Sequence, residues 1–280
     1  MAMPGAGESF LENLHVRLFA AHWIPLGPSW KGPFYNSFWR LYVNTSAGGR
    51  IWTHASEKIE MAPHRVYIVP AWVRFEGYGK KGIEHCYAHF EVLGLPATLI
   101  RAVFNKPCEL QRERPLDACV AGWTAAITGI MEGGALSLEL MIRSKSLVYL
   151  ALARMIGGLS EAERERCVQH LVGRQAMTPA LEYIEAHLAE PIDNEILSDV
   201  CHVSRDHLIR LFRKQIGQTP AQFILERRVS QAAQQLIFSA ASIEQIAEQN
   251  GFLDRFHFSR TFKARMGVPP ATYRKTTPRS

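Results

Sequence analysis

The stretch Ser242–Arg274, SIEQIAEQNGFLDRFHFSRTFKARMGVPPATYR, decides the fold of the C-terminal part of the chain. It repeats a pattern found 50 residues earlier, IDNEILSDVCHVSRDHLIRLFRKQIGQTPAQFI at residues 192–224. In this register the matched pairs are Ile196 with Ile246, Arg210 with Arg260, Phe212 with Phe262, Arg213 with Lys263, Gly217 with Gly267, Pro220 with Pro270 and Phe223 with Tyr273. Each copy predicts a helix, a tight turn and a second helix that ends at a glycine. The sequence therefore predicts a duplicated helix-turn-helix.

Apolar spacing and capping residues give the expected bounds of these helices. The first copy predicts helices near Asn194–Cys201 and Ser204–Ile216, and the second near Ser242–Asn250 and Asp254–Met266. A Thr-Pro pair is expected to cap a helix at Thr178, and Thr219 and Ser242 are each followed three residues later by the Gln of a capping box. No strand pattern interrupts this region, so we expect an all-α domain over residues 178–280.

Helical spacing leaves one face of each second helix pointing away from the core. These outward residues are Arg205, Asp206, Ile209, Arg210 and Arg213 in the first copy, and Arg255, Phe256, His257, Ser259, Arg260 and Lys263 in the second. A recognition helix reaches base edges in the major groove with its N-terminal end, where Arg bonds guanine and Asp accepts from cytosine. On charge alone, a solvated helix face accounts for such residues equally well.

The C-terminal region resembles the AraC/XylS family of transcription regulators. The resemblance rests on Ile246-Ala247, Gly251-Phe252, Phe258-Ser259-Arg260, Phe262-Lys263, Gly267, Pro270 and Tyr273-Arg274. It implies seven helices, with a long helix Pro220–Phe238 joining two helix-turn-helix subdomains. It also implies a bacterial, sequence-specific DNA-binding regulator whose recognition helices enter two major-groove segments of a double-stranded operator about one turn apart. RNA polymerase is a further possible partner of such a regulator.

The resemblance also assigns roles along the recognition helices. Asp206 and Arg210 face bases in the first helix, and Ile209, which departs from the polar residue frequent there, is expected to meet a thymine methyl group. In the second helix the residues facing bases are Arg255, Phe256, His257, Ser259 and Arg260. Arg213 and Lys263 lie further along and are expected to contact phosphates.

The N-terminal part has a different character. All tryptophans lie in the first half of the chain, and short runs such as Phe38–Val43, Arg65–Val69 and His85–Val92 alternate in the manner of β-strands. Helical spacing follows from Ala118 onward. We therefore expect a multi-domain α and β protein, with one domain over residues 1–172 and the DNA-binding domain over residues 178–280.

This region resembles, more loosely, the cupin-like β-barrel sensor of AraC-type regulators, with dimerisation helices from about Leu136 to Leu171. A small barrel encloses one ligand, and aromatic rings stack on the apolar faces of sugars. The candidate effector-binding residues are Trp39, Trp52, His54, His85, Tyr87 and His89. We expect a small-molecule effector, a sugar or related metabolite, and a homodimer, which sedimentation as a monomer at micromolar concentration would contradict.

Two other functions remain open. His85, Tyr87 and His89 alternate on one strand face, and the two histidines, with His54 or His64 from another strand, suggest a cupin-type metal-dependent enzyme that uses its helices for docking. The His-x-His and Glu pattern of metal-binding cupins is absent, so we expect no metal, no cofactor and no enzyme. The second alternative is an effector-independent DNA-binding regulator. The odd number of cysteines, five, favours a cytoplasmic setting, and no uncharged stretch reaches the length of a membrane span.

Overall fold

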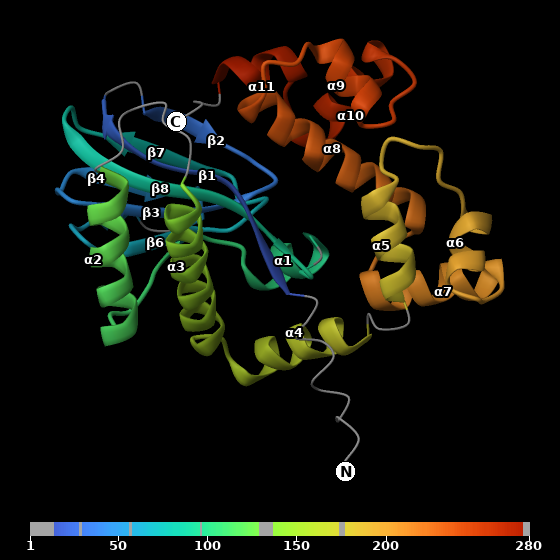
Figure 1. Cartoon of the computed structure of the whole chain (residues 1–280), viewed down its shortest axis with the longest axis horizontal. Helices are drawn as coiled ribbons and strands as arrows, with labels where there is room; N and C mark the ends of the chain where they lie inside the picture. Colours follow the sequence, from blue (N-terminus) through green and yellow to red (C-terminus); the bar gives the residue numbers. More distant parts are fainter. Residues whose placement is uncertain are drawn as a thin grey trace. The chain divides into compact units, whose positions relative to one another are not determined.

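The chain separates into two compact units. The computed structural model describes residues 14–27, 30–55, 58–95, 97–128, 137–173 and 177–276 (Figure 1). The first unit runs from Leu14 to Glu165, and the second begins at Arg166. The division lies within α4 (Glu161–Gly173), a helix that starts shortly after a Gly-Gly pair. Leu136, the expected start of the dimerisation segment, lies outside the described residues.

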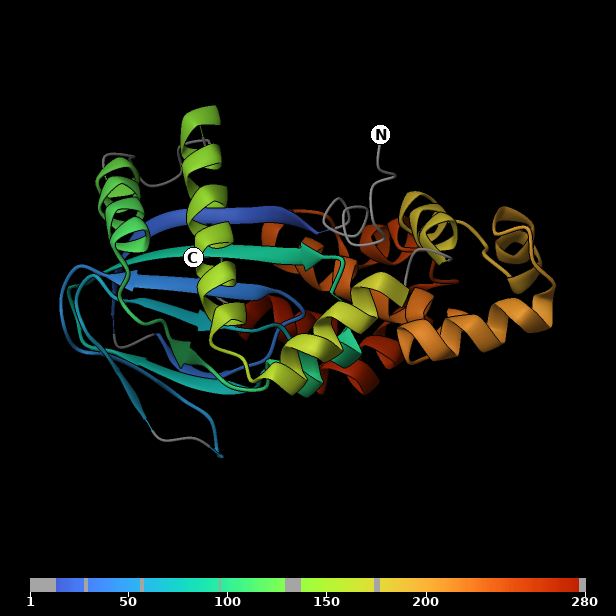
Figure 2. The same cartoon turned by 90° about the horizontal axis from the view of Figure 1, so that it is seen from below.

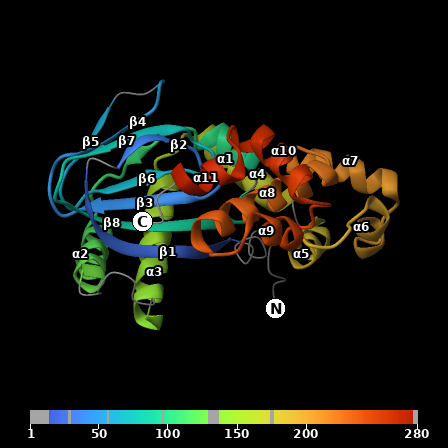
Figure 3. The ribbon, with the colours of Figure 1, turned by 90° about the horizontal axis from the view of Figure 1, so that it is seen from above.

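Two antiparallel sheets form the N-terminal unit. The strands are β1 (His15–Leu26), β2 (Lys31–Phe34), β3 (Trp39–Asn44), β4 (Gly49–Trp52), β5 (Ile59–Met61), β6 (Val66–Val69), β7 (Phe75–Gly79), β8 (Ile83–Leu93) and β9 (Cys108–Glu109). One sheet has the order β1-β8-β3-β6-β9 and the other β2-β7-β4-β5, and the view from above labels all of these strands except β9 (Figure 3). Among the residues that the structure describes, strand pairing does not join the two sheets into a ring. The structure therefore shows a β-rich domain whose sheets are not closed into the expected barrel.

Helices cover one face of the five-stranded sheet. They are α2 (Arg114–Thr128) and α3 (Leu138–Gly157), which both lie against β1 (Figure 2), while α1 (Ala97–Val103) follows β8 along the chain. The indole Nε1 of Trp123 donates to Ser144 Oγ at 2.9 Å and joins α2 to α3. The backbone N of Val16 donates to the Tyr149 hydroxyl at 3.0 Å and joins β1 to α3. These two bonds fix α3 to α2 and to the sheet through polar groups that would otherwise be costly to bury.

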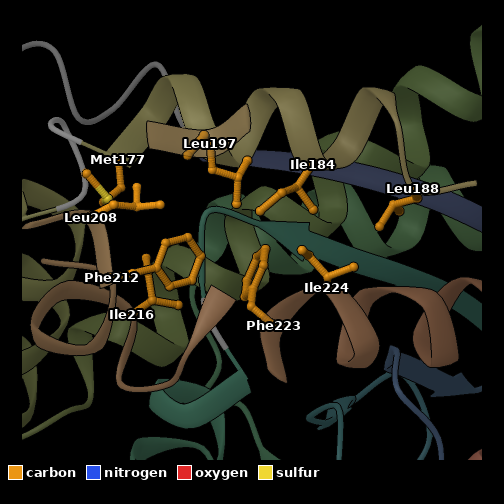
Figure 4. Close-up of a cluster of buried hydrophobic side chains, with 10 residues drawn as sticks. Met177, Ile184, Leu188, Leu197, Leu208, Phe212, Ile216, Phe223 and Ile224 are labelled. Carbon is orange, nitrogen blue, oxygen red and sulfur yellow. The ribbon is translucent and has the colours of Figure 1, made fainter. Parts of the chain in front are cut away.

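The C-terminal unit is helical throughout its described part. Its helices are α5 (Thr178–Ala186), α6 (Asn194–Val200), α7 (Arg205–Ile216), α8 (Pro220–Phe238), α9 (Ile243–Gln249), α10 (Arg255–Met266) and α11 (Pro270–Thr276). Both predicted capping boxes form, at Thr219 with Gln222 and at Ser242 with Gln245. The predicted cap at Thr178 is wrong by one residue, because Met177 is the N-cap and makes no side-chain cap bond. Met177 instead lies in the core shared by α5, α6, α7 and α8 (Figure 4).

The two helix-turn-helix units do not share one register. The N-caps of their first helices, Asp193 and Ser242, lie 49 residues apart, whereas those of the second helices, Ser204 and Asp254, lie 50 apart. Buried Leu197 therefore occupies the place of Ile246, and the pairing of Ile196 with Ile246 is wrong. The turn between α9 and α10 is one residue longer than the turn between α6 and α7.

Candidate nucleic-acid interface

Each second helix has a well-defined start and end. Ser204 Oγ accepts from the backbone N of His207 at the start of α7, and Asp254 Oδ1 accepts from the backbone N of Phe256 and His257 at the start of α10. The bond from the His257 backbone, followed by that from Phe256, lowers the pKa of the Asp254 carboxyl below its usual range. A carboxylate at this position satisfies backbone donors and interacts favourably with the helix dipole.

The predicted DNA-binding residues fall in two groups, one on α7 and one on α10. Nine of them are exposed: Arg205, Asp206, Arg210, Arg213, Arg255, Phe256, His257, Arg260 and Lys263. Ile209 and Ser259 are half-buried. The opposite faces carry Leu208, Phe212 and Ile216 on α7, and Phe258, Phe262 and Met266 on α10, all buried. Each helix therefore packs by one face and presents a largely basic face to solvent.

Helix α8 contacts both helix-turn-helix units, and Arg228 on it makes the connection most directly. Its guanidinium donates to the carbonyl oxygens of Leu188 at 2.8 Å, Glu190 at 2.6 Å and Gly251 at 3.0 Å. The first two follow α5, and the third lies in the turn before α10. Burial lowers the pKa of Arg228, but three carbonyl acceptors compensate the charge. Sequence reasoning missed Arg228 because nothing in its neighbourhood marks its three partners.

The turn before α10 leaves little space around Gly251. This residue has φ of 67°, and a Cβ added there would lie 2.8 Å from Leu188 O and 2.9 Å from Ala189 O. Close by, the side-chain Nδ2 of Asn250 donates to Gln235 Oε1 of α8 at 2.6 Å. Positive φ and close backbone approach both favour glycine. The turn is thus fixed on α8 by backbone and side-chain contacts.

In the N-terminal unit, three of the predicted effector residues lie together between the sheets. His85, Tyr87 and His89 are buried on one face of β8, with ring centroids of Tyr87 and His89 4.7 Å apart. The facing residues of β3 in the same sheet are Arg40, Tyr42 and Asn44. The indole ring of Trp30, just before β2 of the other sheet, lies against them, with its centroid 5.4 Å from that of His85. Arg40, Tyr42, Asn44 and Trp30 were missed by sequence reasoning.

The other three predicted effector residues lie elsewhere. Trp39 is fully buried on the opposite face of β3, with its ring centroid 5.4 Å from that of Phe104. Trp52 is half-buried with Lys58 Nζ 5.3 Å from its ring, and the His54 side chain is 86% exposed. Alternation along β3 and β4 directs Trp39 and Trp52 away from the space between the sheets, and His54 lies in the turn that follows β4. They do not form one site with His85, Tyr87 and His89.

The buried cluster is uncharged apart from Arg40. Burial lowers the pKa of His85 to about 3 and that of His89 well below its usual range, and burial raises the pKa of Tyr42 to about 12. His85 Nδ1 lies 2.7 Å from Asn44 Oδ1, while Asn44 Nδ2 is buried with no hydrogen-bond partner. Among the described residues, no group of three or more His, Cys, Asp or Glu side chains is arranged to hold a metal ion. The cluster offers neutral hydrogen-bonding groups beside aromatic faces.

A separate cavity of about 560 Å³ lies between α1, β9 and the C-terminal end of α3. Its lining includes Phe104, Lys106, Cys108, Gln111 and Arg154, and none of the predicted effector residues. Burial raises the pKa of the Cys108 thiol to about 11, so this thiol is protonated.

None of the helices in the described part of the chain combines the length and the apolar composition that a membrane span requires.

Comparison with known proteins places the C-terminal helices in a family. A family described as "Helix-turn-helix domain" matches residues 197–276. The multiple antibiotic resistance protein MarA of Escherichia coli is 38% identical over 96 residues, which cover 34% of this chain and 76% of MarA. The HTH-type transcriptional regulator GbdR of Pseudomonas aeruginosa is 32% identical over 122 residues, 42% of this chain. The match spans only a third, 33%, of GbdR.

Solved structures extend the likeness to the whole fold. ToxT from Vibrio cholerae aligns with 95% of this chain and 98% of its own, with a TM-score of 0.51 and 12% sequence identity. At that identity the likeness concerns the fold alone, a β-rich N-terminal domain followed by the helical domain. MarA matches over most of its own length, and the matched residues here are those of the two helix-turn-helix units. The chain therefore belongs to the AraC/XylS family of helix-turn-helix transcription regulators.

Proposed function

We propose that this chain is a transcription regulator that binds a specific double-stranded DNA operator with α7 and α10. One observation carries the proposal: two helix-turn-helix units on a common helix each expose a basic face on their second helix. A duplex offers two major-groove segments on one face, one helical turn apart, which suits a pair of recognition helices. We propose that residues 178–280 bind DNA and residues 1–172 act as the sensor, with no catalytic step.

Selection from a random duplex library tests the DNA-binding proposal. The full-length chain is incubated with the library at a fixed salt concentration, and bound duplexes are sequenced after several rounds. We expect enrichment of a bipartite site whose halves are about 10 base pairs apart from centre to centre. A chain in which Arg210 and Arg260 are both alanine provides the comparison. Failure of the unaltered chain to enrich any sequence would contradict the proposal.

For the sensor, we propose a small-molecule effector bound between the two sheets. Support comes from the cluster itself, where Tyr42 and Tyr87 offer aromatic faces and His85, His89 and Asn44 offer neutral hydrogen-bonding groups. This combination suits the apolar faces and hydroxyls of a sugar or related metabolite. One of the ToxT structures is described as bound to an unsaturated fatty acid, so lipid acids are a second class to test.

A thermal-shift screen of the full chain tests the effector proposal. Because a ligand of the native state stabilises it by about 2.7 kcal/mol at 100 times its Kd, we expect a clear rise in Tm with a sugar. Tyr87→Phe removes only a hydroxyl and should weaken binding about fivefold, the value of one hydrogen bond. Trp52→Phe, outside the cluster, should bind as the unaltered chain does. An effect of Trp52→Phe without one of Tyr87→Phe would exclude the cluster as the site.

We also propose a homodimer formed through α3. Four apolar residues on this helix are exposed in the described chain: Leu138 by 68%, Ile142 by 56%, Tyr149 by 40% and Leu150 by 36%. Ile142→Asp places a charge in the centre of this stripe and should weaken self-association more than about tenfold. Sedimentation velocity at micromolar concentration measures the effect, and Phe256→Asp, at an exposed apolar residue of α10 outside the dimerisation segment, should leave self-association unchanged. A monomeric unaltered chain would contradict the dimer.

A further inference from the structure

The extra residue in the turn before α10 is Leu253. The backbone N of Val203 donates to Ser198 O at 3.0 Å in the first unit, and that of Phe252 donates to Ala247 O at 3.0 Å in the second. Val203 and Phe252 therefore occupy equivalent positions in the two turns. After Val203 the next residue caps α7, whereas after Phe252 the chain adds Leu253 before the cap of α10. Leu253 has no counterpart in the first unit.

Leu253 does not contribute to the core. An apolar residue just before an N-cap commonly packs on the fourth residue of the helix, which is Phe258 here. That contact belongs instead to Phe252, which is 6% exposed and has its ring centroid 4.9 Å from that of Phe258. Leu253 is 88% exposed, and Phe256, in the first turn of α10, is 68% exposed. Two large apolar side chains thus stand in solvent at the start of α10.

Cationic side chains predominate around this apolar pair, and the one carboxylate beside it, that of Asp254, accepts hydrogen bonds from the backbone at the start of α10. The Arg255 guanidinium lies 5.2 Å from the centroid of the Phe256 ring, and Arg260 and Lys263 are exposed further along α10. At the start of α7 the position that corresponds to Phe256 is Asp206, a charged residue. An apolar pair among cations fits a polyanion that carries apolar groups. In the major groove the thymine C5-methyl is that group, while the other base-edge features are hydrogen-bond donors and acceptors.

We propose that Leu253 and Phe256 recognise thymine methyl groups in the operator segment bound by α10. The inference rests on the proposed DNA-binding function and assigns the chemistry of one half of the site. Contact removes water from the methyl group and from the two side chains, which is favourable in proportion to the apolar area buried. The two recognition helices then differ at their starts: α7 begins with charged residues suited to polar base edges, whereas the residues at the start of α10 favour thymine.

The test removes the methyl group alone. The full chain binds duplexes of its selected operator in which single thymidines are replaced by deoxyuridine, which keeps every hydrogen-bonding group. We expect affinity to fall about fourfold at each contacted thymidine of the α10 segment, as for loss of one buried methylene-sized group. The double variant Leu253→Ser/Phe256→Ser should bind equally well whether the α10 segment carries thymidine or deoxyuridine. Both side chains are exposed, so we expect its Tm to stay close to that of the unaltered chain.

Val168→Ser, at an exposed apolar residue of α4, is the matched control and should retain the preference for thymidine. Equal affinity of the unaltered chain for deoxyuridine and thymidine duplexes would overturn the inference while DNA binding stands. A selected operator without thymidine in the α10 segment would overturn it in the same way. If no sequence is selected at all, the proposed function fails and the inference fails with it.

Discussion

Replacing both Arg210 and Arg260 by alanine should weaken binding to the selected operator by about 2–6 kcal/mol. Each arginine occupies the same position on its recognition helix, is exposed, and is expected to bond a base edge, a contact whose loss costs about 1–3 kcal/mol. The two positions read different segments, so their effects should be roughly additive. Fluorescence anisotropy titrations of labelled operator and of a scrambled duplex measure the loss and show whether specificity falls with affinity.

Two comparisons separate base contacts from general electrostatics. Arg213→Ala and Lys263→Ala should each reduce the slope of log K against log salt by about 1 while the preference for the operator stays, because a phosphate contact carries no sequence information. Arg114→Ala, an exposed arginine at the start of α2, should change neither quantity. If Arg210→Ala/Arg260→Ala lowers the salt slope and leaves the preference intact, both arginines contact phosphates and the assignment is wrong.

Gly251→Ala should lower the free energy of unfolding of the C-terminal unit by about 2–4 kcal/mol. A residue with a Cβ at φ of 67° is strained by about 1 kcal/mol or more, and its Cβ would approach two backbone oxygens within 2.9 Å. Relief requires the turn to move away from Leu188, which also pulls the Gly251 carbonyl from Arg228. Differential scanning calorimetry should show the transition of this unit lowered by roughly 10 °C or more.

The Gly82→Ala variant separates the cost of backbone strain at a positive φ from the cost of steric crowding around the added Cβ. Gly82 has φ of 84°, yet a Cβ added there meets nothing within 4 Å. Its substitution should therefore cost only the backbone strain, about 1 kcal/mol, in the N-terminal unit. Equal losses for Gly82→Ala and Gly251→Ala would show that crowding around Gly251 contributes nothing.

The helical half of the chain could be predicted from sequence because its signals are local. Capping boxes, glycine C-caps and apolar spacing depend on residues a few positions apart, so the bounds of α7 and α10 and the start of α8 follow from them. The one-residue difference between the turns could not be predicted. Strong matches in the second helices impose a single 50-residue offset, and nothing in the sequence shows that His202 takes the positive φ in one turn and Gly251 in the other.

The sensor cluster was predicted only in part, for a different reason. His85, Tyr87 and His89 alternate on β8, so their common face follows from strand geometry. Every residue of β3 is buried, so both faces of this strand carry core side chains and their alternation does not indicate which face points between the sheets. The sequence predicts Trp39 as a member of the cluster, whereas the structure places Arg40 and Tyr42 there. Which strands face each other depends on long-range pairing that a single sequence does not reveal.

The rigid support of α10 on α8 constrains how target sites can change over time. Helix α8 is 19 residues long, about 28 Å, and Arg228 fixes the turn before α10 to the residues that follow α5. One base pair inserted between operator halves rotates the second half by about 35° around the duplex axis, since a turn holds roughly 10 base pairs. Because Arg228 holds the two helix-turn-helix units in one relative orientation, α10 does not follow that rotation. New promoters should therefore come under this regulator through point mutations within each half, while insertions or deletions between the halves release genes from control.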